Sequence, residues 1–300
     1  MRFNCGEVIT AMVTPMKEDK SVDFEKAAKL ANYLSNNGSD AIVVAGTTGE
    51  SPTLTHEEEL ELLAVVKDSV DNGCKIIMGT GSNSTDTAVM MSKKAELAGA
   101  DAILCVVPYY NKPSQKGMIE HFSAIAEAVD LPIILYNIPS RTGVNMSVET
   151  VKYLAERYDN IVALKQSYGD MDTITELRLF CPDDFVLLSG DDSLTLPMMS
   201  LGVNGVISVA SHIFGKAIKE MITEFKSGNI LKAREIHQGL YPSFRKLFMA
   251  PNPIPVKAVL AGNGLIYEYV RRPLNQLTDD EKTELFSVIQ ATQANLVALL

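Results

Sequence analysis

Short apolar runs recur along the chain, and each is followed by a longer segment with helical periodicity. The runs begin about 20 to 35 residues apart, a spacing typical of repeated strand–helix units. Their nearly continuous hydrophobicity indicates parallel strands that are covered on both faces. The eight predicted strands comprise residues 8–12, 41–45, 75–79, 102–107, 132–137, 161–165, 185–189 and 205–209.

The segments between these runs carry signals that begin and end amphipathic helices. Thr55, with Glu58 three residues later, has the pattern of a capping box, and Gly38 and Gly99 each follow a helical segment. The predicted helices comprise residues 24–36, 56–71, 85–98, 147–158, 172–180, 192–201 and 214–227, with three more in the C-terminal part, 230–249, 256–263 and 278–299.

Strands and helices that alternate in this way form either an open doubly wound sheet or a closed barrel. No GxGxxG or GxxxxGK[ST] motif follows the first strands, whereas polar and glycine-rich residues follow several different strands. That distribution is typical of the C-terminal rim of a barrel. We therefore predict an α/β fold: a (β/α)8 TIM barrel of residues 1–228, with a C-terminal helical extension of residues 229–300 packed on the barrel.

Composition and charge exclude several classes of protein. The chain has 300 residues and a net charge of −10, which argues against nucleic-acid binding because that needs a basic surface. No apolar run reaches the roughly 18–20 residues that span a bilayer, and the N-terminus is too short and polar for a secretory signal. The four histidines are scattered, without the spacing of a metal site. We expect a cytoplasmic protein without a metal, a nucleic-acid partner or a membrane anchor.

Lys165 ends the apolar run 161–165 and is the first candidate for chemistry. Burial at the end of a strand disfavours the charged form of a lysine. The neutral amine is the nucleophile that forms Schiff bases with carbonyl substrates. The alternative is a lysine just outside the strand that points to water.

Other functional groups follow other predicted strands. Tyr136 ends the fifth strand, where its phenol could transfer protons, and Arg141 follows in a loop, where a guanidinium can bind a carboxylate through two hydrogen bonds. The segment GTTGE, residues 46–50, offers backbone N–H groups and hydroxyls to an anion. The adjacent Tyr109 and Tyr110 cannot both point inward, so one is expected to pack at a subunit contact. Taken singly, each residue could be structural, but their grouping on successive strand ends indicates one active site.

At these residues the sequence resembles the dihydrodipicolinate synthase family, one of the pyruvate-dependent class I aldolases that include N-acetylneuraminate lyase. The resemblance runs from AMVTP at 11–15 to NPIPVK at 252–257. Its most specific parts are GTTGE at 46–50, YNIPSRTG at 136–143, Lys165 and LSGDD at 188–192.

The resemblance implies a lyase that joins pyruvate to aspartate 4-semialdehyde in the diaminopimelate and lysine branch of amino-acid biosynthesis. Lys165 would form the Schiff base, and Tyr136 would exchange protons with Thr47 and with Tyr110 of a neighbouring subunit. Binding of the two substrate carboxylates falls to Thr48, Gly190 and Ile207 for pyruvate, and to Arg141 for the aldehyde. No cofactor or metal is implied, because the imine itself is the electron sink. The implied assembly is a homotetramer, a dimer of dimers, and at least a dimer.

Two departures from the family pattern affect these expectations. Gln166 stands where a glutamate is usual, which could alter the electric field at the imine. At the usual site of lysine feedback, Glu59 and Thr87 replace the expected histidine and glutamate, although four residues match: Ser51, His56, Asn83 and Tyr109. Loss of an acidic ligand at Thr87 predicts weak or absent inhibition by lysine.

Two other functions stay open at this point. One is another pyruvate-dependent aldolase that acts on N-acetylneuraminate or a keto-sugar acid, although Arg141 favours a carboxylate-bearing aldehyde. The other is a non-catalytic barrel that binds a small acid, against which the intact set of Lys165, Tyr136, Thr47 and Arg141 argues.

Overall fold

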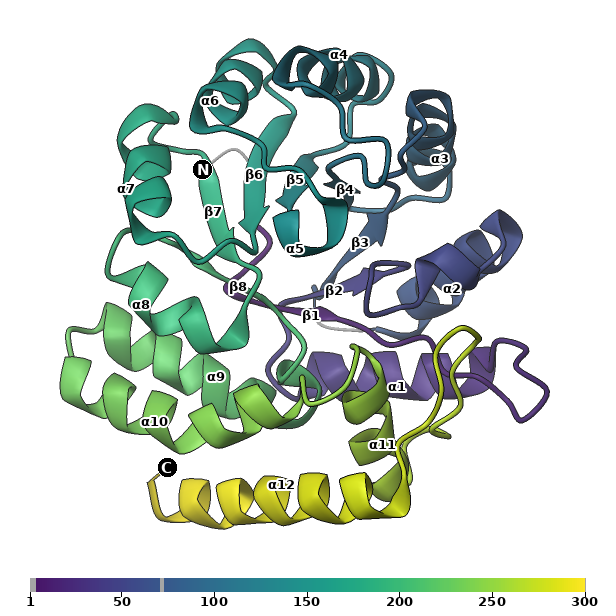
Figure 1. Cartoon of the computed structure of the whole chain (residues 1–300), viewed down its shortest axis with the longest axis vertical. Coiled ribbons are helices and arrows are strands. Elements are labelled where there is room, and N and C mark those ends of the chain that lie inside the picture. The colour runs from purple at the N-terminus through teal and green to yellow at the C-terminus, as the bar shows by residue number, and fades with distance from the viewer. Residues whose placement is uncertain (1–3, 71–72, 300) are drawn as a thin grey trace. The chain divides into compact units, whose positions relative to one another are not determined.

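The computed structural model describes residues 4–70 and 73–299. Eight parallel strands follow one another in chain order in a sheet that closes into a barrel (Figure 1). The predicted TIM-barrel fold is therefore confirmed. The strands are β1 (Val8–Ala11), β2 (Ala41–Val44), β3 (Lys75–Gly79), β4 (Ala102–Val106), β5 (Ile133–Asn137), β6 (Ile161–Gln166), β7 (Val186–Ser189) and β8 (Gly205–Ser208).

Helices separate and follow the strands, as the sequence predicts. They are α1 (Phe24–Asn36), α2 (His56–Ser69), α3 (Thr85–Leu97), α4 (Gln115–Ala126), α5 (Pro139–Thr142), α6 (Val148–Arg157), α7 (Met171–Phe180), α8 (Thr195–Met199), α9 (Ser211–Lys226), α10 (Ile230–Lys246), α11 (Ile254–Gly262) and α12 (Asp279–Leu299), with the 3-10 turns η1 (Ser51–Thr53) and η2 (Asp192–Leu194).

Several helices differ from the predicted ones. The sequence pattern does not predict α4 or the short α5, and α9 begins at Ser211 instead of 214. The segment 192–201 is not one helix but η2 followed by α8, because Pro197 interrupts the helical pattern. Helix α2 ends at Ser69, and Asp71, at the end of the predicted helix 56–71, lies outside the described residues.

The capping box at the start of α2 is present. The Thr55 hydroxyl accepts a hydrogen bond from the Glu58 N–H, and the Glu58 carboxylate accepts one from the Thr55 N–H. These two bonds satisfy backbone donors that the first turn of a helix leaves without partners.

The chain divides into two compact units. Unit 1 consists of Lys75–Ile207 together with Met1–Gly6, and unit 2 consists of Glu7–Cys74 together with Ser208–Leu300. In unit 1, strands β3 to β7 carry α3, α4, α6 and α7 along their outer side (Figure 1). In unit 2, α10 packs between α9 and α12. The expected boundary between a barrel at 1–228 and an extension at 229–300 stays a prediction.

The strands that carry the candidate site are buried along their whole length. Every residue of β5, β6 and β7 is buried, which agrees with the continuous hydrophobicity of their sequences. No helix among the described residues is long and apolar enough to cross a membrane.

Candidate active site

Lys165 lies at the C-terminal end of β6, beside Tyr136 at the end of β5. The two residues are register partners in the parallel pair, and the Lys165 Nζ lies 4.2 Å from the centroid of the Tyr136 ring. Lys165 is only 6% exposed and Tyr136 only 5%. The lysine therefore points inward rather than to water. No carboxylate in the described part of the chain forms an ion pair with its amine, so the nitrogen is not committed to a salt bridge.

Gly190 follows β7 and lies against Lys165. A Cβ at this position would fall 1.8 Å from the Ser167 Oγ and 3.0 Å from the Lys165 Cε, which excludes any other residue without a rearrangement. The Gly190 N–H donates to the Gln166 carbonyl over 2.8 Å and so continues the pairing of β6 with β7. Ile207 is buried on β8, directly after Val206, which is the register partner of Ser189.

Arg141 lies in the short helix α5, which directly follows β5. Its side chain is exposed, and no acidic residue of the described chain pairs with the guanidinium. Asn137, the last residue of β5, connects the start of this loop to its end at Asn145 and Met146. Its amide donates to Asn145 Oδ1 over 2.7 Å and its Oδ1 accepts from the Met146 N–H over 3.1 Å. The guanidinium is thus presented from an anchored loop and is available to a carboxylate.

Gln166, the first departure from the family pattern, lies on the face of β6 opposite to Lys165, because successive residues of a strand alternate. Its Oε1 accepts a hydrogen bond from Asn137 Nδ2 over 2.9 Å. A glutamate could accept the same bond. The substitution therefore preserves the contact with the neighbouring strand and removes a charge that would point away from Lys165.

The GTTGE segment follows β2 in unit 2 and forms a tight turn. The N–H groups of Gly49 and Ser51 both donate to the Gly46 carbonyl. Ala45, just before the segment, and Glu50, its last residue, have φ values of 52° and 59°. This left-handed conformation costs a residue with a side chain roughly 1–2 kcal/mol. Thr48 is buried and Thr47 is partly exposed. Contacts from outside the turn are needed to hold such a conformation.

Those contacts come from the C-terminal part of unit 2. The Lys257 ammonium forms an ion pair of 2.5 Å with Glu50, and the two side chains are 0% and 2% exposed. Lys257 also donates to the Tyr269 carbonyl over 2.7 Å, and the Arg271 N–H donates to the second Glu50 oxygen over 2.9 Å. Burial lowers the pKa of Lys257, and the charge of Glu50 opposes that shift. No local sequence signal connects these two residues, which are 207 positions apart.

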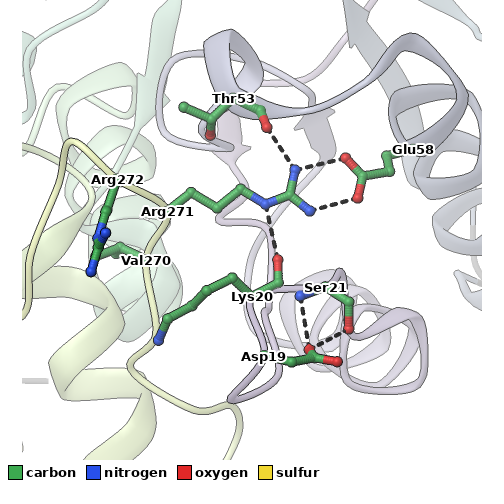
Figure 2. Close-up of a pocket in the computed structure, with 8 residues that line it drawn as sticks. All are labelled: Asp19, Lys20, Ser21, Thr53, Glu58, Val270, Arg271 and Arg272. Carbon is green, nitrogen blue, oxygen red and sulfur yellow. Dashed lines mark hydrogen bonds and ion pairs between the residues drawn. The ribbon is translucent and has the colours of Figure 1, made fainter.

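Arg271 extends the same anchor and lines a neighbouring pocket (Figure 2). Its guanidinium holds both oxygens of Glu58 and also donates to the carbonyls of Thr53 and Lys20. The hydrogen bonds from Arg271 hold the pKa of Glu58 below its usual value. The Arg271 guanidinium forms four hydrogen bonds to protein acceptors and pairs with the Glu58 carboxylate, so it has little capacity left to bind an anion in this pocket.

Tyr110 is 89% exposed, and its backbone φ of 71° lies in the left-handed region. Tyr109, by contrast, is partly buried. The neighbouring loop is tied to unit 1 because the Asn111 amide donates to the Asn83 carbonyl over 2.8 Å. The exposed ring of Tyr110 agrees with the expectation that one tyrosine of the pair packs outside its own chain.

Other residues of the expected effector site lie near the start of α2. The His56 Nδ1 lies 3.1 Å from the Glu59 carboxylate, and Ser51 begins η1. Burial raises the pKa of Glu59, and His56 opposes that shift. Glu59, which departs from the family pattern, therefore interacts with His56 of the same helix.

Unit 1 brings together Lys165, Tyr136 and Gly190, with Arg141 and Ile207 on adjoining segments. Thr47 and Thr48 belong to unit 2, and their action together with Lys165 stays a prediction. Among the described residues there is no group of three or more His, Cys, Asp and Glu side chains that could hold a metal ion.

Comparison with known proteins gives a consistent result. The sequence model of the dihydrodipicolinate synthetase family matches residues 4–292. The 4-hydroxy-tetrahydrodipicolinate synthase of Desulforamulus reducens is 51% identical over 276 residues, which cover 92% of this chain and 93% of the relative. That of Bacillus subtilis is 49% identical over 96% of this chain and 99% of its own. The crystal structure of DHDPS from Cyanidioschyzon merolae with lysine bound has a TM-score of 0.95 and 49% identity, covering 96% of this chain and 98% of that chain.

Proposed function

Because the chain belongs to the dihydrodipicolinate synthetase family, we propose that it is a lyase that condenses pyruvate with aspartate 4-semialdehyde, the reaction of a 4-hydroxy-tetrahydrodipicolinate synthase. This reaction opens the diaminopimelate and lysine branch of amino-acid biosynthesis. One observation carries the proposal: Lys165 is buried at a strand end of the barrel beside the Tyr136 ring, and no carboxylate of the described residues neutralises it.

The proposed chemistry begins with attack of the Lys165 amine on the keto carbon of pyruvate. Loss of water from the carbinolamine gives an imine, and removal of a methyl proton gives the enamine. The enamine carbon then attacks the aldehyde carbon of the second substrate, whose amino group later displaces Lys165. The protein needs no organic cofactor for these steps, because the imine accepts the electron pair.

The other residues of the site would bind and exchange protons. Tyr136 would exchange protons with Thr47 and with the partner subunit's Tyr110. The pyruvate carboxylate would bind at Thr48 and at the Gly190 and Ile207 backbone. Support comes from the burial of Thr48 and from the contact of Gly190 with Lys165.

Arg141 would bind the carboxylate of aspartate semialdehyde. Its guanidinium is exposed, has no acidic partner among the described residues and lies in a loop that Asn137 anchors. A guanidinium recognises a carboxylate through two parallel hydrogen bonds, so this residue selects acceptors that carry one.

We also propose a cytoplasmic homotetramer, a dimer of dimers, in which Tyr110 completes the site of a neighbouring subunit. The 89% exposure of this ring and its strained backbone support that role. Helices within residues 229–300 would form an extension packed on the barrel of residues 1–228. Support comes from the hydrogen bonds of Asn252, Lys257 and Arg271 to the GTTGE turn. Sedimentation velocity tests the assembly, and Tyr110→Ala should lower activity without unfolding the chain.

Regulation by lysine should be weak or absent. Thr87 cannot supply the negative charge that would bind a second ammonium, and Glu59 is paired with His56. Thr87→Glu should strengthen inhibition by lysine in a direct activity assay, and a wild-type enzyme inhibited by micromolar lysine would contradict this proposal.

Two measurements test the reaction itself. Borohydride should trap pyruvate on the peptide that contains Lys165, and Lys165→Met should lose the adduct and keep the circular dichroism spectrum of the wild type. The exposed Lys116→Met is the matched control and should trap normally.

Activity with aspartate semialdehyde is then followed through the NADPH-dependent reductase that consumes the product. Trapping without this activity would move the acceptor to a sugar-acid aldehyde. Absence of trapping would refute the proposed chemistry altogether.

A further inference from the structure

Thr48 has one side-chain partner among the described residues, and it lies far away in the sequence. The Asn252 Nδ2 donates to the Thr48 Oγ1 over 2.9 Å, across a separation of 204 residues. Both residues are at least nine-tenths buried, with Thr48 3% and Asn252 8% exposed. Asn252 lies two residues before α11, the helix that carries Lys257.

The direction of this hydrogen bond determines what Thr48 can do for a ligand. An amide NH2 group only donates, so the Thr48 oxygen is the acceptor and its own hydrogen remains to be donated. The described residues contain no acceptor for that hydrogen. A carboxylate accepts hydrogen bonds and donates none, so it is the ligand that a hydroxyl in this state suits.

The second polar atom of the Asn252 amide is an acceptor, which requires a donor and not a carboxylate. Its Oδ1 is buried and has no partner among the described residues. In this orientation the Asn252 Oδ1 is an acceptor without a donor in the described part of the chain.

Glu50 keeps this arrangement in place two residues beyond Thr48. Lys257 and the Arg271 N–H each hold one of its oxygens, and the Thr14 hydroxyl donates to the Gly49 carbonyl over 2.6 Å. The turn that carries Thr48 is thus fixed from both sides, so the hydroxyl has little freedom to rotate away from a ligand.

We propose that Asn252 is a positioning residue that orients the Thr48 hydroxyl so that its hydrogen is donated to the carboxylate of the bound keto acid. The inference rests on the proposed function, because it takes pyruvate as the ligand of Thr48.

Asn252→Asp is the most informative variant because it keeps the shape and removes the donor. An ionised carboxylate at this position accepts the Thr48 hydrogen and thereby takes it from the substrate. The pyruvate KM should rise by about 10- to 100-fold, with a smaller change in kcat. Relative to the wild type at each pH, the KM should recover as the pH falls and the new carboxyl group becomes a donor. A role in folding alone would not produce that recovery.

Three further variants complete the test. Asn252→Ala should raise the pyruvate KM by about 3- to 10-fold, without the pH-dependent recovery. In a Thr48→Val background, Asn252→Ala should add no more than about twofold, since Asn252 acts through Thr48. Asn275→Asp, the same change at an exposed site, should leave the KM unchanged.

Borohydride trapping separates the inference from the proposed function. If the wild type does not trap pyruvate, the proposed function fails. If the wild type traps pyruvate and folded Asn252→Asp traps it equally at half-saturating concentration, the proposed function stands and the role of Asn252 is overturned. Equal KM values for the Asp and Ala variants at every pH would overturn it as well.

Discussion

Replacing Lys257 by methionine would leave the Glu50 carboxylate buried without its cation. Methionine has a similar length, so the change removes charge and hydrogen bonds with little change in volume. Of its side-chain hydrogen bonds in the described part of the chain, Glu50 would keep the one from the Arg271 N–H, and the Tyr269 carbonyl would lose the Lys257 donor.

The expected cost follows from the geometry of the pair. At 2.5 Å and an effective dielectric constant of about 20, the attraction between the charges is roughly 7 kcal/mol. Removing two ions from water costs several kcal/mol for each, so the net contribution of the intact pair is small. Removal of one partner alone leaves the desolvation uncompensated. We therefore expect Lys257→Met to lower the free energy of unfolding by about 3–5 kcal/mol.

Urea denaturation of a double-mutant cycle measures this effect. Glu50→Gln should also destabilise the chain, but the Lys257→Met and Glu50→Gln double variant should be more stable than the sum of the single changes predicts, by at least about 1.5 kcal/mol. Lys282→Met is the matched control, because its partner Glu268 is more exposed, and it should cost less than about 1 kcal/mol.

The same variant tests the link to the site. If the pair holds the GTTGE turn, folded Lys257→Met at low temperature should show a raised pyruvate KM. A loss of less than 1 kcal/mol, or costs that simply add in the cycle, would refute the reasoning about the buried pair.

Three other changes test separate parts of the structure. Gly190→Ala should abolish trapping of pyruvate, since its Cβ would meet the Ser167 Oγ and the Lys165 Cε, and trapping should partly return when Ser167→Ala is added. Burial lowers the pKa of His212 to about 4, so the unfolded chain binds a proton below pH 6.5 that the folded chain does not bind. The free energy of unfolding should accordingly fall by up to about 3 kcal/mol between pH 6.5 and 4, and His212→Gln should flatten this slope by about one proton. Gln166→Glu should change the KM for pyruvate by less than about threefold, because the acceptor for Asn137 is kept and the side chain points away from Lys165; a tenfold change would contradict this reading.

The barrel could be predicted because its signals are local. Continuous apolar runs, capping residues and glycine stops each occupy a few neighbouring positions. Helix α4 shows how such a signal is overlooked. Its buried residues Met118, Phe122 and Ile125 have helical spacing, and Ser114 caps its first turn, but the preceding loop is rich in polar residues and proline.

Two lysines in apolar surroundings show where local patterns fail. Lys165 ends a strand and Lys257 lies in the apolar helix α11, but the sequence pattern predicts a buried amine only for Lys165. The structure distinguishes them, since Lys257 meets Glu50 from 207 residues away and Lys165 lies beside a tyrosine ring. Asn252 is a similar case, because no spacing rule connects it to Thr48. Tertiary pairing over such separations leaves no periodic trace in a single sequence.

The anchoring of the GTTGE turn by residues 252–271 also sets an order in time. The ribosome makes about 5–20 residues each second, so Lys257 emerges roughly 10–40 seconds after Glu50 has been synthesised. During that interval the Glu50 carboxylate remains hydrated and the turn lacks the contacts that hold its left-handed residues. The GTTGE turn is therefore among the last parts of the chain to mature. If it binds pyruvate as proposed, a nascent protein should not retain pyruvate there before translation has passed α11.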